Sequence, residues 1–230
     1  MKKILFIEGY DTINYNKDTE DNISKLLSKY KITFFTYKND ENIYHILNRL
    51  QTLIENNFYK AIIGHSTGAL LVKIITNRIK INNKTKIILT NGIVSDKHNL
   101  SLFLLGSMPH YITELVKIPR CFRVELFLLT YGYDKYLLNF IDPKQYNIDD
   151  ASIIGDLLKI AKKYDFNHNT AYHVIYGKDD YRIEYTKNII DQLFKNSNIH
   201  LYSLKSKHEP FNDYKNIQQK WKKIILNIIE

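Results

Sequence analysis

Hydrophobic positions follow two alternating patterns over most of the chain. Short runs of β-branched, aromatic and other apolar residues are typical of buried strands, and we predict strands over residues 3–8, 32–37, 61–63, 86–91, 171–176 and 199–204. Between these runs, apolar residues recur at helical spacing, as in a helix that buries one face. This spacing predicts helices beginning near residues 19 and 212, and helices over residues 41–56, 68–79, 149–163 and 182–194. Strands that alternate with helices predict an α/β fold, with a mostly parallel sheet of about six strands and helices on both of its faces.

The alternation stops between about residues 95 and 148. This segment contains apolar clusters such as residues 102–105, and Pro109, Pro119 and Pro143 interrupt it. Because it is too rich in apolar residues for a polar surface loop, we predict several short helices here. The sequence shows no internal repeat, low-complexity tract or linker, so we expect a single domain over residues 1–230, with residues 95–148 inserted in it.

Composition and cysteine content bear on the compartment of the protein. Of the 230 residues, 44% are hydrophobic and 25% are charged, as in globular proteins. Cys121 is the one cysteine, so an intrachain disulfide is excluded and a reducing compartment is the simpler interpretation. The apolar run at residues 4–7 ends at Glu8 and is too short for a signal peptide, and no stretch approaches the roughly 18 apolar residues of a membrane-spanning helix. We therefore expect a cytoplasmic protein.

The formal net charge of +9 allows two interpretations. A basic protein would be attracted to an anionic partner such as a membrane surface. The basic residues, however, are mostly lysines spread along the chain, and Ile, Asn and Tyr are also abundant, as an AT-rich genome would produce. Basic and aromatic residues do not interleave as they do in nucleic-acid-binding modules. We therefore expect no nucleic-acid partner and at most a weak association with anionic membranes.

Candidate chemistry is concentrated where the predicted strand over residues 61–63 meets the following helix. The turn between them reads Gly64-His65-Ser66-Thr67-Gly68, which is a G-x-S-x-G motif. The central serine of such a turn has a strained backbone, and side chains at the two glycine positions would crowd the neighbouring strand and helix. The helix N-terminus also directs free N–H groups to the space where an oxyanion would form. These features predict that Ser66 is a nucleophile.

A serine hydroxyl needs an adjacent base, and that base needs an acid that orients it. In an open parallel sheet, loops at the carboxyl ends of the strands bring such groups together. His208 follows the last predicted strand, Asp179 and Asp180 follow the strand before it, and Asp96 follows the strand before that. The sequence therefore predicts His208 as the base and leaves Asp180, Asp179 and Asp96 as candidates for the acid.

From residue 3 to its end, the chain resembles an α/β-hydrolase that begins at the third strand of the usual eight. The chain order Ser66, Asp180, His208, with each residue after a predicted strand, matches the catalytic triad of that family. The resemblance favours Asp180 as the acid, because Gly177 to Asp180 fits the family's G-x-x-D placement. Residues 95–148 fall where many members insert a cap or lid. The resemblance thus implies the α/β-hydrolase fold with a helical cap insertion.

The resemblance also implies two donors to an oxyanion. One is the backbone N–H of Thr67, the residue after the nucleophile, and the other is the N–H of Tyr10 in the loop after the first strand. Gly9 would let the substrate approach this loop closely. The sequence departs from the family's usual His-Gly pair by placing Glu8 before Gly9, and a carboxylate beside an oxyanion would be unhelpful.

The resemblance implies a serine hydrolase that cleaves a small-molecule ester, thioester or lipid through an acyl-enzyme. If the inserted segment covers Ser66, a hydrophobic acyl group would contact its apolar residues, which include Leu102, Phe103, Leu105, Met108 and Phe127. Other reactions of the same fold (C–C hydrolysis, lyase or perhydrolase chemistry) are alternatives, as is a non-catalytic binding protein on this scaffold. No dinucleotide, P-loop or zinc-protease motif and no cysteine cluster is present, so we expect no cofactor and no metal. The substrate and the oligomeric state stay open.

Overall fold

The structure is a computed structural model of the chain, and it describes all residues except 10–15, 38–40, 95–151, 181–182, 184 and 197. The described strands are β1 (Lys3–Ile7), β2 (Lys31–Phe35), β3 (Ala61–His65), β4 (Lys86–Thr90), β5 (Tyr172–Gly177) and β6 (Ile199–Leu204). The described helices are α1 (Asn16–Leu26), α2 (Ile43–Glu55), α3 (Gly68–Arg78), α8 (Ser152–Ala161), α9 (Lys187–Phe194) and α10 (Lys215–Ile229). The predicted cap over residues 95–148 lies outside the described residues.

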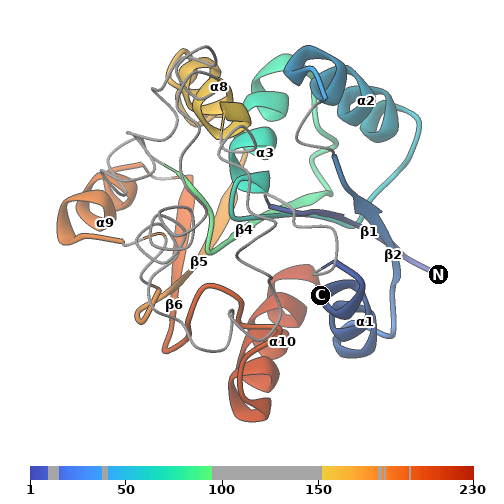
Figure 1. The fold of residues 1–230 in the computed structure, drawn as a ribbon, viewed down its shortest axis with the longest axis vertical. Coiled ribbons are helices and arrows are strands. Elements are labelled where there is room, and N and C mark those ends of the chain that lie inside the picture. The colour runs from blue at the N-terminus through green and yellow to red at the C-terminus, as the bar shows by residue number, and fades with distance from the viewer. Residues whose placement is uncertain (10–15, 38–40, 95–151, 181–182, 184, 197) are drawn as a thin grey trace, which may run out of the picture.

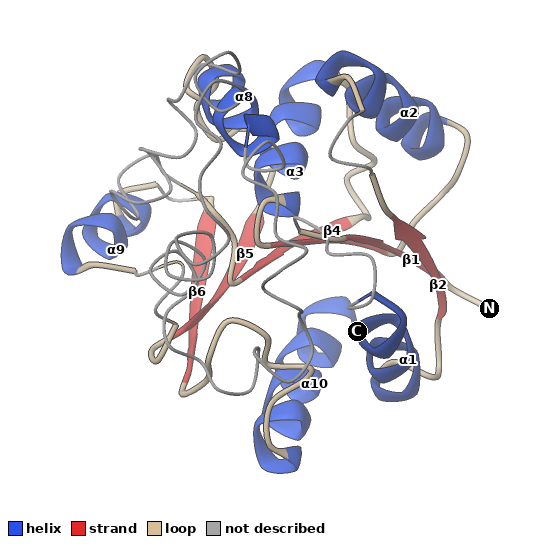
Figure 2. Ribbon diagram, in the orientation of Figure 1, coloured by secondary structure: helices blue, strands red, loops and turns tan. Residues whose placement is uncertain are grey.

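The described strands form one sheet in the order β2-β1-β3-β4-β5-β6, and every neighbouring pair is parallel. Every residue of the central strand β3 is buried, as expected for a parallel strand that is covered on both faces. Figure 2 shows the sheet crossing the molecule, with helices on either side of it. The predicted parallel sheet with helices on both faces is therefore confirmed.

Alternation along β1 shows how the sheet divides the core into two layers (Figure 1). Leu5 and Ile7 belong to the layer that contains residues of α2, α3, α8 and α9. Ile4 and Phe6 belong to the layer that contains residues of α1 and α10. Because successive side chains of a strand point to opposite faces, an apolar run of this kind is buried only when helices cover both. The two layers hold the carboxyl ends of the strands in a fixed arrangement at one edge.

Helix α9 begins later than the sequence predicts. We predicted a helix over residues 182–194, but α9 starts at Lys187. Thr186 caps it, since its hydroxyl accepts a hydrogen bond from the Ile189 N–H at 3.4 Å. The preceding Ile183 and Tyr185 are buried. These residues are buried in the loop after β5 rather than in a helical turn, and the Tyr185 ring stacks on that of Tyr176 in β5 with 5.1 Å between the centroids.

Candidate active site

The G-x-S-x-G motif forms the turn between β3 and α3. Ser66 is half-buried and has a φ of 53°, in the left-handed region that a residue other than glycine seldom adopts. A Cβ atom at Gly68 would lie 2.3 Å from the Ile7 carbonyl oxygen, and one at Gly64 would lie 2.8 Å from the Gly68 carbonyl oxygen. Glycine at both positions therefore lets α3 pack closely against the strands. The turn places Ser66 at the carboxyl edge of the sheet.

His208 and Asp180 form a buried pair in the loops after β6 and β5. His208 Nδ1 lies 2.8 Å from Asp180 Oδ2, the Asp180 side chain is fully buried, and the His208 side chain is 9% exposed. The neighbouring candidate Asp179 is half-buried, and its backbone N–H donates to the Ser206 carbonyl at 3.1 Å. Asp96 lies outside the described residues. Of the two described candidates for the acid, Asp180 is the one that accepts a hydrogen bond from His208.

Several hydrogen bonds hold Asp180 in its ionised form. Besides His208, its Oδ2 accepts from Asn91 Nδ2 at 3.0 Å, and its Oδ1 accepts from the Ile183 N–H at 3.1 Å. Burial would raise the pKa of Asp180, but the charge and hydrogen bond of His208, with the hydrogen bonds of Asn91 and Ile183, lower it to about 2. Asp180 is thus a carboxylate at neutral pH and can stabilise an imidazolium on His208.

His65 connects the serine turn with the histidine loop. Its ring centroid lies 4.9 Å from that of His208 and 4.9 Å from that of Phe211. His65 Nδ1 lies 3.0 Å from the Thr90 carbonyl oxygen, which can only accept, so Nδ1 carries the hydrogen in this contact. The Ser66 N–H donates to the same carbonyl at 3.4 Å. The end of β4 therefore supports the serine turn, and the residue before the candidate nucleophile packs against the candidate base.

Two of the predicted oxyanion-site residues are described, and both lie at the serine turn. A Cβ atom at Gly9 would lie 2.6 Å from Ser66 Cβ and 3.2 Å from Ser66 Oγ, so glycine keeps the space beside the hydroxyl open. Thr67 precedes the first residue of α3, and its N–H donates no hydrogen bond within the described part of the chain. Its hydroxyl instead lies 2.8 Å from the Tyr37 hydroxyl. The Thr67 N–H can therefore donate to an oxyanion beside Ser66, whereas Tyr10 lies outside the described residues.

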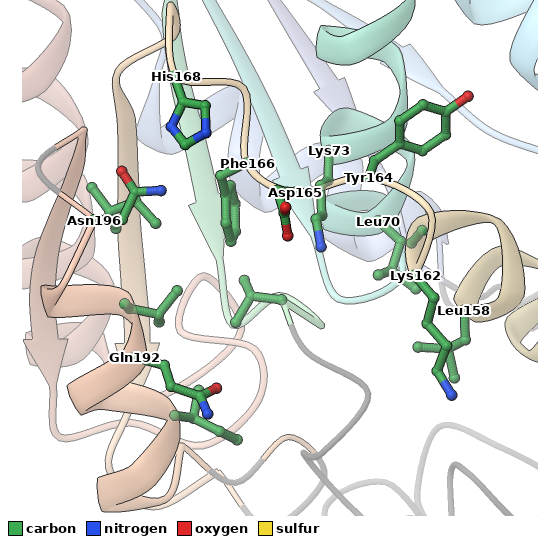
Figure 3. A pocket seen from close by; sticks show the side chains of 15 residues that line it. Leu70, Lys73, Leu158, Lys162, Tyr164, Asp165, Phe166, His168, Gln192 and Asn196 are labelled. Carbon is green, nitrogen blue, oxygen red and sulfur yellow. The ribbon is translucent and has the colours of Figure 1, made fainter.

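A pocket of about 440 Å³ opens between α3, α8 and α9. In Figure 3, the side chains of Lys73, Asp165 and Phe166 lie together in its upper part, and Lys73 Nζ is 5.2 Å from the Phe166 ring centroid. Ser66, Asp180 and His208 are not among its lining residues. The residues predicted to contact an acyl group, Leu102, Phe103, Leu105, Met108 and Phe127, lie outside the described residues. The pocket is thus separate from the candidate catalytic residues.

Sequence analysis missed one residue of the site, Asn91. It directly follows β4, as Ser66 follows β3, so a search of every strand end for polar residues would have found it. Its importance depends on contacts with Asp180 and with Lys207, which are 89 and 116 residues away in sequence. No local pattern indicates such contacts.

Metal-binding clusters and membrane-spanning helices are both absent from the described part of the chain. No group of three or more His, Cys, Asp or Glu side chains in it is arranged to hold a metal ion. Its helices include none that is both long enough and apolar enough to cross a membrane.

Comparison with solved structures finds matches over nearly the whole chain, although no model of a protein family and no curated protein matches the sequence. An esterase from Exiguobacterium antarcticum is 11% identical with a TM-score of 0.62, and the match covers 100% of this chain and 92% of that one. An α/β-hydrolase fold protein from Burkholderia ambifaria is 11% identical with a TM-score of 0.61, covering 98% and 90%. A bromoperoxidase from Bacillus anthracis is 13% identical with a TM-score of 0.59, covering 99% and 91%. At such identities the likeness concerns the fold.

Proposed function

We propose that this chain, which has the α/β-hydrolase fold, is a serine hydrolase that cleaves a carboxylic ester or thioester. The observation that carries the proposal is the buried 2.8 Å hydrogen bond between His208 and Asp180 in strand-end loops beside the Ser66 turn. A serine on a strained turn, a histidine and a buried carboxylate, in this chain order, are the groups that acyl transfer requires. Because one fold serves many reactions, the site supports this proposal more strongly than the fold does.

Each residue has a separate role in the proposed reaction. Ser66 Oγ attacks the carbonyl carbon of the substrate while His208 Nε2 accepts the hydroxyl proton. Asp180 holds the Nδ1–H of His208 and stabilises the imidazolium that forms. His208 then gives the proton to the leaving alcohol or thiol, which leaves an acyl ester on Ser66. Water attacks this ester with His208 again as base, and the free acid and Ser66 are released.

The developing oxyanion needs donors that are already in place. The Thr67 N–H is our first donor, since it has no acceptor within the described part of the chain and lies at the N-terminus of α3. For the second donor we propose the Tyr10 N–H, with Gly9 keeping the approach to Ser66 open. A fixed donor of this kind typically contributes about 10²- to 10³-fold to kcat.

A fluorophosphonate probe tests the nucleophile, since it forms a covalent bond with an activated serine. We expect stoichiometric labelling of the wild-type chain at Ser66 and none in S66A. Ser203→Ala serves as the matched control, because Ser203 is exposed on β6 and outside the site, and it should label like the wild type. Labelling at another residue, or labelling of S66A at the wild-type level, would contradict the proposal.

We further propose a hydrophobic acyl group of medium or long chain. The support is the apolar content of residues 95–148, including Leu102, Phe103, Leu105, Met108 and Phe127. Each buried methylene contributes at most about 0.8 kcal/mol of binding. Activity (kcat/KM) toward p-nitrophenyl esters should therefore rise from acetyl to octanoyl. A steady preference for acetyl over longer chains would count against this part of the proposal.

Another chemistry of the same fold is the alternative, and the likeness to a protein named as a bromoperoxidase is the observation that favours keeping it. C–C hydrolysis, lyase and perhydrolase reactions belong to this class. The same ester panel separates the two. If every ester is inert while Ser66 still reacts with the probe, the alternative is favoured.

A further inference from the structure

Asn91 occupies a constrained position at the centre of the candidate site. It directly follows β4, is fully buried, and has a φ of 45°, which asparagine tolerates better than most residues. Its backbone N–H donates to the Ile175 carbonyl at 2.8 Å and so extends the pairing of β4 with β5. The backbone of Asn91 is therefore held between the strand that supports the serine turn and the strand that precedes Asp180.

The side-chain amide of Asn91 reaches two loops at once. Its Nδ2 donates to Asp180 Oδ2 at 3.0 Å and to the Lys207 carbonyl at 3.1 Å. An amide nitrogen carries two hydrogens, so both donors are used. The reversed amide would set an oxygen against a carboxylate oxygen and a carbonyl oxygen, so only this orientation satisfies the contacts. Because Lys207 directly precedes His208, one amide contacts both the acid and the backbone beside the base.

The surroundings of this amide show that its donors matter more than its packing. Its Oδ1 is buried and accepts no hydrogen bond from any residue that the structure describes. A buried acceptor of this kind costs stability, and an apolar side chain of the same size would avoid the cost. Gly177 also leaves room for the amide, since a Cβ atom there would lie 2.6 Å from Asn91 Nδ2.

We propose that Asn91 is a positioning residue that sets the geometry of the acid and the base, an inference that rests on the proposed function. On Asp180 it donates to the same oxygen that accepts the His208 Nδ1–H, so it keeps that oxygen directed at His208 and favours the carboxylate. On Lys207 it fixes the backbone from which His208 projects. The orientation of the imidazole toward Ser66 then follows from one buried amide.

Two substitutions remove these donors while respecting the backbone of Asn91. Asn91→Gly suits the left-handed φ and deletes the amide, and Asn91→Asp keeps the shape but replaces both donors by acceptors. Thr76→Val is the matched control, because it removes a buried hydroxyl that lies 2.7 Å from the Tyr172 hydroxyl, away from the candidate site. Stability of all variants is measured by urea denaturation, and kinetics are measured on the ester that the wild-type chain hydrolyses best.

We expect both Asn91 variants to lose about 10- to 100-fold in kcat, with KM within about threefold of wild type, as for a lost hydrogen bond to a charged group. In Asn91→Asp, a second carboxylate beside Asp180 favours the protonated imidazole, so the acid limb of the kcat/KM profile should move to higher pH. Thr76→Val should lose stability with the acid limb unmoved. If kcat stays within about twofold in both Asn91 variants, or the Asn91→Asp limb does not move, the proposal is wrong.

A second measurement needs no turnover. The hydrogen that His208 Nδ1 donates to Asp180 should give a strongly deshielded proton NMR signal in the wild type and in Thr76→Val, assigned by its loss in His208→Gln. We expect this signal to be broadened or absent in both Asn91 variants. Its absence from the wild type, or its persistence in both variants, would overturn the proposed role of Asn91. A wild-type chain that shows the signal but neither hydrolyses esters nor labels at Ser66 would instead refute the proposed function alone.

Discussion

Asp180→Asn tests both the chemistry and the energetics of the buried pair. The substitution is nearly isosteric, but it removes the charge and turns one acceptor oxygen into a donor. In the wild type, Oδ2 accepts from His208 and Asn91 while Oδ1 accepts from the Ile183 N–H. An asparagine must therefore direct its NH₂ group at existing donors in either orientation. We expect loss of the Ile183 hydrogen bond or reorientation of the His208 ring.

The effect on stability follows from the pKa of Asp180, which is about 2 in the folded chain against an ordinary value of 3.8. This lowering corresponds to about 2 kcal/mol of folding free energy at neutral pH. Because the folded pKa is depressed, the contribution is complete above the unfolded value and is lost as the pH falls through the folded one. The stability deficit of Asp180→Asn should thus be largest near neutral pH and shrink between about pH 4 and pH 2.

Urea denaturation across this pH range measures the deficit, and ester hydrolysis near neutral pH measures the effect on catalysis. We expect a loss of roughly 10⁴-fold in kcat, the scale of an isosteric replacement of a triad acid. Asp179→Asn is the matched control, because Asp179 is half-buried and its carboxylate is not the partner of His208. Its kcat should stay within about threefold of wild type. An Asp180→Asn chain with wild-type kcat, or a deficit that does not change with pH, would refute the reasoning.

Four further substitutions test the serine turn, the Gly9 loop and Glu209, the residue after His208. Ser66→Ala and Ser66→Gly should both abolish probe labelling. In thermal unfolding, Ser66→Gly should be the more stable of the two by about 1 kcal/mol, because glycine is unstrained at a φ of 53°. Equal stabilities would show that the turn stores no strain. Gly9→Ala would set a Cβ atom 2.6 Å from Ser66 Cβ. Because this displaces the nucleophile, kcat should fall by about 10²-fold. An unchanged kcat would place the Gly9 loop away from the reacting atoms. Burial raises the pKa of Glu209 to about 8, partly offset by a hydrogen bond from Asn212. Because the folded pKa is raised, the stability of the wild-type chain falls as the pH rises from about 4.5 to 8. Glu209→Gln should therefore gain about 1 kcal/mol over wild type across that range, a figure kept small because Glu209 is only half-buried. Parallel curves of Tm against pH for the two chains would contradict this.

Much of the fold could be predicted from the sequence, because its signals are local. Burial of a strand or of one helix face requires apolar residues at a fixed spacing, and that spacing is visible in any window of the chain. The sheet and the positions of Ser66 and His208 after β3 and β6 follow from such windows together with the rule that loops at the carboxyl ends of strands carry the site. The boundary of α9 was wrong because Ile183 and Tyr185 are apolar and buried, as residues of a helix face would be, but belong to the loop between β5 and α9.

The acid and its support required the three-dimensional arrangement. Asp179 and Asp180 are adjacent in sequence and identical in type, yet only Asp180 places its carboxylate 2.8 Å from His208 Nδ1. Asn91 contacts residues 89 and 116 positions away, through a side chain whose role no neighbouring residue indicates. Such contacts depend on the order β3-β4-β5-β6, which sets four strand ends side by side, and on the direction of each side chain at its strand end. Periodicity states which residues are buried, whereas the partners of a buried polar group depend on how distant segments meet.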